Sequence, residues 1–188
     1  MTQAAREIEG VSLPPAGKYE LDPSHTEIGF VARHMLTKVR GRFTEFDGMI
    51  EVAERPEDSS VNVEVKTASV QTNTDQRDDH LRSADFFGSE EYPLMTFRST
   101  AWRHAGGSSF ELVGELTIKD VTKPLTLEGE FHGWGKDPYE NTKIFAEAKA
   151  TVEREDWDLT WNVAIETGGF LVSRTIDIVI DVEASLVG

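Results

Sequence analysis

Residues 75–99 read DQRDDHLRSADFFGSEEYPLMTFRS, and within this stretch an alternating pattern stops and then resumes. Asp78 and Asp79 mark what we predict to be the acidic first turn of a short helix, where carboxylates favour the positive end of the helix dipole. Two adjacent phenylalanines, Phe86 and Phe87, follow and need an apolar place to pack. We therefore interpret the stretch as a plug or lid at the mouth of a β-barrel.

On both sides of this stretch, apolar residues alternate with polar ones, which is the pattern of half-buried β-strands. In residues 26–34, for example, Ile28, Phe30, Ala32 and His34 share one face. The connections between the alternating segments are mostly of hairpin length, which favours antiparallel neighbours. Apart from a short strand at 18–21, we predict strands at 26–34, 39–53, 61–70, 94–104, 110–118, 125–131, 144–152 and 176–182.

These segments predict an all-β fold. We expect an antiparallel up-and-down barrel of about eight strands with a short helical insertion, because closing the sheet removes its exposed edges. A chain of 188 residues is most simply one domain. We assign residues 18–188 to the barrel and residues 1–17, with Pro14, Pro15 and Gly17, to a flexible N-terminal arm.

The composition argues against several classes of function. There is no cysteine, so neither a disulfide nor a cysteine-based zinc site can form. The net charge of −15 argues against binding of nucleic acid and against electrostatic docking on an anionic membrane. No apolar run reaches the roughly 18 residues of a transmembrane helix, so we expect no stable membrane insertion. The first residues lack the apolar core of a signal peptide, which predicts a cytoplasmic protein.

The interior of such a barrel is open to two readings. A barrel of about eight strands is either filled by its own side chains or holds one small ligand. Small residues occupy positions that we expect to face inward, namely Gly114, Gly129, Ala146, Ala148 and Ala150. These residues either leave a hollow or make room for bulky neighbours in a packed core.

Catalytic and metal-binding chemistry has little support in the sequence. There is no HExxH, P-loop or GxSxG motif, and the carboxylates are not grouped into a shielded pair, so we predict no catalytic residue and no metal site. His34 is either a core or rim residue, as we favour, or a metal ligand. His80 either hydrogen-bonds the polar head of a ligand or caps its turn, and His104 is assigned to the surface. Arg154 either faces the barrel mouth or, as we favour, pairs with an acidic neighbour. Trp157 and Trp161, on the long loop, either pack as a second lid or anchor the loop.

Four motifs together resemble the YceI-like family of polyisoprenoid-binding proteins, over nearly the whole chain from Tyr19 to Leu186. The opening Y-x-x-D-x-x-H-S/T-x-x-x-F-x-x-x-H motif is matched by Tyr19, Asp22, His25, Thr26, Phe30 and His34. The V-x-G-x-F-x-x-F-x-G motif is matched by Val39, Gly41, Phe43, Phe46 and Gly48. The R-D-x-H-L-R-S-x-D-F-F motif is matched by Arg77, Asp78, His80, Leu81, Arg82, Ser83, Asp85, Phe86 and Phe87. The G-x-L-T-x-x-x-V-T-K-P motif is matched by Gly114, Leu116, Thr117, Val121, Thr122, Lys123 and Pro124.

This resemblance implies an extended, lipocalin-like barrel that holds a long isoprenoid chain, such as a quinone tail, in an apolar tunnel. We expect no cofactor other than such a bound isoprenoid or quinone, and a homodimer is compatible with the barrel. From the resemblance and the alternation together, we predict ligand-binding residues at Ile28, Phe30, His34, Phe43, Phe46, His80, Leu81, Phe86, Phe87, Met95, Phe97, Leu116, Phe131, Arg154 and Trp157.

We therefore expect a binding or carrier protein rather than an enzyme, and two alternatives stay open. An enzyme acting on a small apolar or lipid substrate would need a pair of titratable groups with perturbed pKa values inside the cavity. A barrel with a filled core, acting through its surface, would have no room for a hydrocarbon chain.

Overall fold

The computed structural model describes residues 6–188, so the predictions for residues 1–5 of the arm lie outside the described residues. None of the helices in these residues is both long and apolar enough to cross a membrane. The helices are α1 (Asp75–Arg82) and the 3-10 helices η1 (Pro56–Asp58), η2 (Thr67–Ser69) and η3 (Arg154–Trp157). The strands are β1 (Glu7–Ile8), β2 (Val11–Ser12), β3 (Gly17–Leu21), β4 (Glu27–His34), β5 (Thr37–Phe43), β6 (Phe46–Val52), β7 (Ser60–Lys66), β8 (Val70–Gln71), β9 (Leu94–Gly106), β10 (Ser109–Ile118), β11 (Val121–Lys136), β12 (Thr142–Glu153) and β13 (Thr175–Val187).

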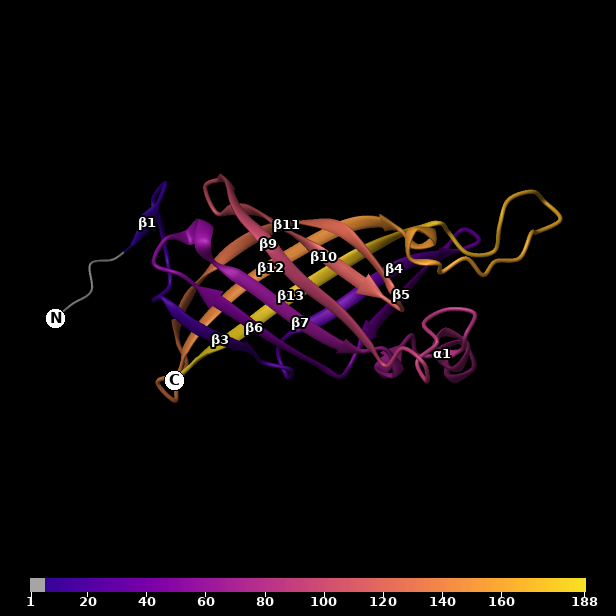
Figure 1. Ribbon diagram of the computed structural model, residues 1–188, viewed down its shortest axis with the longest axis horizontal. Helices are drawn as coiled ribbons and strands as arrows, with labels where there is room; N and C mark the ends of the chain where they lie inside the picture. The colour runs from indigo at the N-terminus through magenta and orange to yellow at the C-terminus, as the bar shows by residue number, and fades with distance from the viewer. Residues whose placement is uncertain (1–5) are drawn as a thin grey trace.

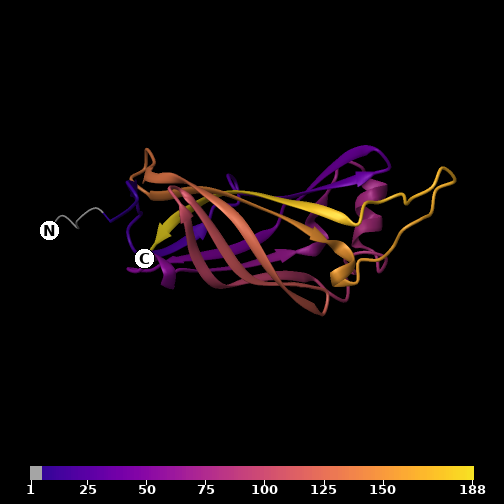
Figure 2. The ribbon, with the colours of Figure 1, turned by 90° about the horizontal axis from the view of Figure 1, so that it is seen from above.

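Antiparallel strands form a closed, elongated barrel of eight strands (Figures 1 and 2). β3 and β4 pair with different parts of β13 and together act as one bent strand of the barrel. β6 pairs with β3 and β5 pairs with β4, so β5 and β6 together form the neighbouring strand. The remaining strands follow in chain order until β12 pairs with β13 along its whole length. The predicted up-and-down barrel with a short helical insertion is confirmed.

The predicted continuous strand at 39–53 is wrong in one respect, because the chain bends between β5 and β6. At the bend, the Ser69 hydroxyl accepts hydrogen bonds from the backbone N–H groups of Thr44 and Glu45, at 3.2 and 3.0 Å. The bend lets one long segment follow both halves of the β3–β4 unit around the barrel. The alternating sequence pattern does not reveal this bend, because the hydrogen-bonding partner of the bend, Ser69, is distant in the sequence.

Glycines on the inner face make room for phenylalanine rings from the neighbouring strand. A Cβ atom on Gly41 would lie 2.2 Å from the ring of Phe30, which is its cross-strand partner. A Cβ on Gly129 would lie 2.1 Å from the ring of Phe110, its partner on β10. These glycines therefore accommodate bulky neighbours, which is the second of the two readings given for the small residues.

The corner between β3 and β4 accounts structurally for the first sequence motif. Thr26 Oγ1 donates to the carbonyl oxygen of Glu183 at 2.8 Å and accepts from its N–H at 3.1 Å. Asp22 lies 3.1 Å from both His25 Nδ1 and Lys143 Nζ. These bonds fix the corner against β12 and β13, so most of this motif closes the barrel rather than facing its interior.

Asp22 at this corner should make part of the free energy of unfolding depend on pH in the acid range. The hydrogen bond with His25, followed by those from the Ser24 N–H and Lys143, lowers the pKa of Asp22 to about 2. Because the folded pKa is depressed, the stabilisation is present above the unfolded pKa of about 4 and is lost as the pH falls toward 2. Urea unfolding over this window should show a shallower pH dependence for Asp22→Asn than for the wild type. Asp120→Asn, at an exposed turn, is the control, and an unchanged slope for Asp22→Asn would contradict the assignment.

Candidate functional site

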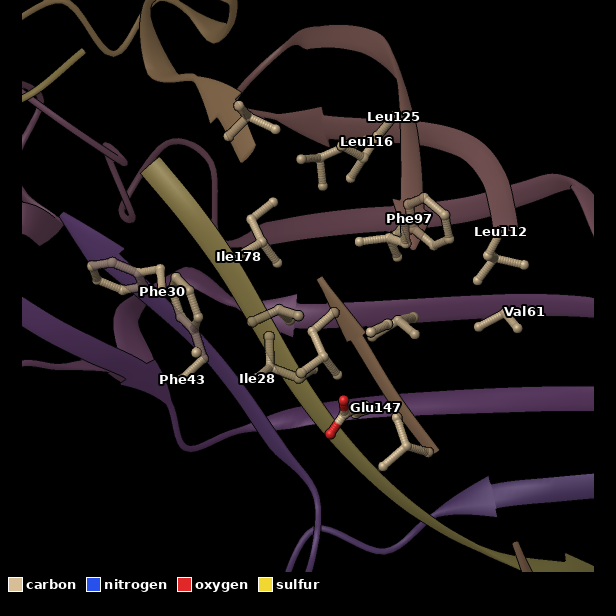
Figure 3. Close-up of a pocket in the computed structure, with 18 of the residues that line it drawn as sticks. Ile28, Phe30, Phe43, Val61, Phe97, Leu112, Leu116, Leu125, Glu147 and Ile178 are labelled. Carbon is tan, nitrogen blue, oxygen red and sulfur yellow. The ribbon is translucent and has the colours of Figure 1, made fainter. Parts of the chain in front are cut away.

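The barrel encloses an apolar cavity of about 720 Å³. In Figure 3, side chains from several strands point into this cavity, among them Ile28 of β4, Phe97 of β9 and Ile178 of β13. The volume lies within the range of about 300–1,000 Å³ that is typical of ligand pockets. Its lining reaches from Arg6 near the N-terminal arm to Trp161 beyond η3, so the cavity extends along the barrel.

Alternation along the strands decides which side chains line the cavity. Ala146 and Ala148 of β12 are among the lining residues, so here small side chains do border a hollow. Phe30 and Phe43 also line it, with their ring centroids 5.9 Å apart. The other apolar wall positions include Leu21, Val39, Ile50, Val61, Val63, Val65, Met95, Leu112, Leu116, Leu125, Leu127, Phe131, Ile144, Ile176, Ile180 and Val182.

The segment formed by α1 and the following phenylalanines lies at one end of the barrel (Figure 1). The Phe87 ring packs edge-on against Phe43, with centroids 5.5 Å apart. The His80 ring packs edge-on against Phe86 and Trp161, at 5.1 and 4.5 Å. Both phenylalanines line the cavity, so their rings face the interior at this end.

Hydrogen bonds, of which those between Thr72 and Asp78 are buried, hold this end segment in place. Asp78 accepts hydrogen bonds from the backbone N–H and the hydroxyl of Thr72, at 2.8 and 2.5 Å. Arg82 donates to the carbonyl oxygens of Ala68 and Val70. His80 Nε2 lies 2.8 Å from Asp85, so one ring nitrogen has a partner on the segment itself.

Arg154 is the buried cation of the same end, and its side chain is not paired with a carboxylate. Only 4% of the residue is exposed, and its guanidinium donates to the carbonyl oxygens of Leu159, Trp161 and Ser173. Its Nη2 atom is buried and has no hydrogen-bond partner among the described residues. The predicted pairing of Arg154 with an acidic neighbour is therefore wrong, because Glu155 binds Arg174 instead.

Burial lowers the pKa of Arg154 from its ordinary value. A guanidinium nevertheless stays protonated at physiological pH, so this end of an apolar cavity holds a fixed positive charge. Trp157 follows in η3, and its Nε1 donates to the carbonyl oxygen of Leu116 at 2.9 Å. Trp157 thus anchors the loop to β10 while also lining the cavity.

The opposite end is covered by part of the segment predicted as a flexible arm. β1 and β2 form a small hairpin, and Ile8 and Val11 from it line the cavity. Arg6 donates to the carbonyl oxygens of Ala53 and Pro14, which ties this hairpin to the barrel rim. His104, predicted on the surface, is partly buried and lines this end, with Nε2 2.9 Å from the carbonyl oxygen of Gly107.

All of the predicted ligand-binding residues except Phe46 line the cavity. Phe46 is instead buried within a hydrophobic core cluster, where it is the cross-strand partner of Val65 on β7. The contacts of the others with a ligand stay a prediction. Sequence reasoning missed the aromatic residues Trp102 and Phe110 and the valines of β7 as lining residues, although their alternating positions carried that signal.

Comparison with known proteins agrees with this architecture. The family model of the YceI-like domain matches residues 19–184. Protein YceI of Escherichia coli is 36% identical over 172 residues, which cover 89% of this chain and 86% of that protein.

Two solved structures extend the comparison. The structure of the Campylobacter jejuni YCEI protein is 28% identical with a TM-score of 0.72, covering 83% of this chain and 90% of that one. A polyisoprenoid binding domain from Saccharophagus degradans has a TM-score of 0.68 at 13% identity, covering 92% of this chain and 100% of that one, which shows a shared fold. The family match and the identity to the curated relative, taken with the closed barrel and its cavity, place this chain in the family of proteins with a YceI-like domain.

Proposed function

We propose that this protein is a non-enzymatic binding or carrier protein for a long-chain isoprenoid lipid or quinone held inside the barrel. The observation that carries the proposal is the apolar cavity, which extends from the N-terminal hairpin to the α1 segment and is lined on all sides by aliphatic and aromatic side chains. The Saccharophagus degradans protein with the same fold is described as polyisoprenoid binding, which supports the same class of ligand here.

The energetics of such a site need few polar contacts. Each buried methylene contributes about 0.8 kcal/mol, so ten buried carbons contribute roughly 8 kcal/mol before the cost of association. An elongated hollow therefore suits a chain with many carbons and a small head group.

Charge within the cavity supports placing the head group at the α1 end. The chain has 34 acidic and 19 basic residues, yet the described lining includes one acidic residue, Glu147, against Arg6 at the opposite end and three arginines at the α1 end, Arg33, Arg77 and Arg154. None of these three arginines forms an ion pair with a carboxylate in the described part of the chain. We propose that Arg154, with His34 and His80 nearer the mouth, faces oxygen atoms of the ligand.

The alternatives have less support. Acid–base catalysis typically uses two tuned groups, whereas Glu147 is the one carboxylate on the described lining, and its exposed side chain lies 3.3 Å from His132. A filled core is hard to reconcile with a cavity of about 720 Å³. The cytoplasmic location and the homodimer stay predictions.

Extraction of the purified native protein with organic solvent, followed by mass spectrometry, tests the proposal. We expect an isoprenoid at near-stoichiometric yield, and uptake of added isoprenoid quinone by protein from which lipid has been stripped. Heat-unfolded protein carried through the same steps controls for lipid that adheres non-specifically. No recovered isoprenoid, together with no uptake of added quinone, would defeat the proposal.

Head-group placement predicts discrimination between ligands with matched chains. A quinone whose carbonyl oxygen accepts a hydrogen bond from a buried charged donor should bind about tenfold or more tightly than a hydrocarbon of equal chain length, because such bonds contribute about 1.5–3 kcal/mol. Competition for a fluorescent fatty probe measures both affinities. Equal affinities would mean that the guanidinium does not contact the head group.

A further inference from the structure

Two loop tips beside the α1 end of the cavity expose large apolar side chains. The β4–β5 turn exposes Met35 and Leu36, which are 51% and 92% accessible. The loop between η3 and β13 exposes Val163 and Phe170, which are 47% and 59% accessible. This loop extends beyond the barrel in both ribbon views, with the β4–β5 turn beside its base (Figures 1 and 2).

Backbone contacts join the two tips into one surface, which we call the apolar tip and define as Met35, Leu36, Val163 and Phe170. The Met35 N–H donates to the carbonyl oxygen of Leu171 at 2.8 Å. His34 forms an isolated antiparallel bridge with Val172. The apolar tip therefore projects as a unit that the barrel supports from beneath.

The apolar tip adjoins the cavity without belonging to its lining. His34, Leu171 and Val172 line the cavity, whereas none of the four residues of the apolar tip does. Within the same two segments, some residues thus line the cavity while their neighbours in the apolar tip do not. A partner that covered the apolar tip would lie directly against this end of the cavity.

The charge beside the apolar tip differs in sign from that of the whole chain. Residues 28–44 contain Arg33, Lys38, Arg40 and Arg42 and no acidic residue, and residues 162–173 of the other tip contribute one acidic residue, the exposed Glu166, although the net charge of the protein is −15. Arg33, Lys38 and Arg40 are exposed and form no ion pair in the described residues. Beyond a Debye length of about 8–10 Å the acidic remainder of the surface is largely screened, so the local charge decides what docks here.

We propose that the apolar tip, with Lys38 and Arg40, docks on the surface of a lipid bilayer that contains anionic phospholipids. The apolar side chains enter the boundary between head groups and acyl chains, and the cations contact lipid phosphates. Helix α1, which carries the exposed carboxylates of Asp75 and Asp79, lies apart from the β4–β5 turn in Figure 1, which orients the contact toward the β4–β5 side. The inference rests on the proposed function in one respect, since a bilayer is where an isoprenoid chain dissolves.

Flotation with vesicles of phosphatidylcholine and phosphatidylglycerol tests the docking. The full-length protein should float with these vesicles, and the double variant Leu36→Ser/Phe170→Ser should partition at least about tenfold less, because two large apolar side chains are removed from the lipid. Tyr139→Ser is the matched control, since Tyr139 is 85% exposed in the β11–β12 turn at the other end of the barrel. Its partitioning should not change.

The contribution of Lys38 and Arg40 can be measured separately from that of the apolar side chains. Lys38→Gln/Arg40→Gln should weaken binding to vesicles with phosphatidylglycerol by about tenfold or more, as expected for about 1 kcal/mol per cation near an anionic surface, and should have little effect with phosphatidylcholine alone. Added salt should weaken wild-type binding in the same direction. Equal loss on both kinds of vesicle would contradict a role of charge in the docking.

Two outcomes would overturn the docking, namely absence of flotation by the wild type and unchanged flotation of Leu36→Ser/Phe170→Ser. If unchanged flotation came with a change from dimer to monomer in that variant, the tip would be assigned to a second copy of this chain. Quinone uptake from detergent separates the two proposals. Flotation without uptake defeats the carrier function alone, and uptake without flotation defeats the docking alone.

Discussion

Ala148→Phe should weaken the binding of a long isoprenoid by more than about 100-fold while leaving the barrel folded. Ala148 lies near the middle of β12, between Gly129 of β11 and Ile180 of β13, and it lines the cavity. Gly129 already carries the ring of Phe110 over it, so a second ring at this level would narrow the tunnel from the adjacent strand. A chain confined to one half of the cavity then loses the burial of its far half.

The expected loss of affinity is large. Each methylene excluded costs about 0.8 kcal/mol, so exclusion of only four carbons weakens binding by more than about 100-fold. Titration with quinones of increasing tail length measures the effect. The variant should bind short-tailed quinones nearly as well as the wild type and should gain nothing from a longer tail.

The adjacent residue provides the control for Ala148→Phe. Lys149 is exposed on the outer face of the same strand, so Lys149→Phe adds a ring of the same size outside the cavity. This variant should keep wild-type affinity at every tail length. If Ala148→Phe retained the affinity for long tails, the chain would not pass the middle of the barrel, and the tunnel proposal would need a different path.

Arg154→Met should lower the free energy of unfolding by about 3 kcal/mol. The guanidinium satisfies the carbonyl oxygens of Leu159, Trp161 and Ser173, and a methionine of similar length satisfies none of them. Each buried polar group left without a partner costs about 1–3 kcal/mol, and partial hydration of the loosened loop reduces the sum. Urea unfolding followed by tryptophan fluorescence measures the change, and Trp157 and Trp161 lie beside the substitution.

Arg174→Met is the comparison for this prediction. Arg174 pairs with Glu155 on the surface, at 2.8 Å, with 63% of its side chain exposed. An exposed pair contributes about 0–1 kcal/mol, so this variant should unfold close to the wild type. Equal destabilisation of the two variants would show that Arg154 does not organise the loop through its buried hydrogen bonds.

The alternating pattern predicted most of the cavity wall, because inward and outward positions along a strand follow from a period of two residues. Ile28 and Phe30 on β4 and Leu116 on β10 were assigned in this way, and all three line the cavity. The short helix and its two phenylalanines also lie at one end of the barrel, where the sequence placed them.

Contacts that join distant segments could not be predicted in the same way. The backbone carbonyls that surround Arg154 lie on an irregular loop, and no sequence pattern distinguishes them from the carboxylate partner that we favoured. Phe46 alternates as a lining residue should and shares a face with Val65, but it is packed within the core cluster and does not border the cavity. Such cases depend on tertiary packing, which overrides the local pattern.

Closure of the sheet by β12 and β13 has a consequence for the kinetics of exchange. Backbone hydrogen bonds join β3, β6, β7, β9, β10, β11, β12 and β13 into an unbroken ring, so a bound chain cannot leave sideways through this part of the wall. Departure then proceeds lengthwise past an end, and at the α1 end the segment that the buried Asp78–Thr72 hydrogen bonds hold in place lies beside the exit. Dissociation should then be a slow, first-order process whose rate constant is independent of the concentration of competing ligand.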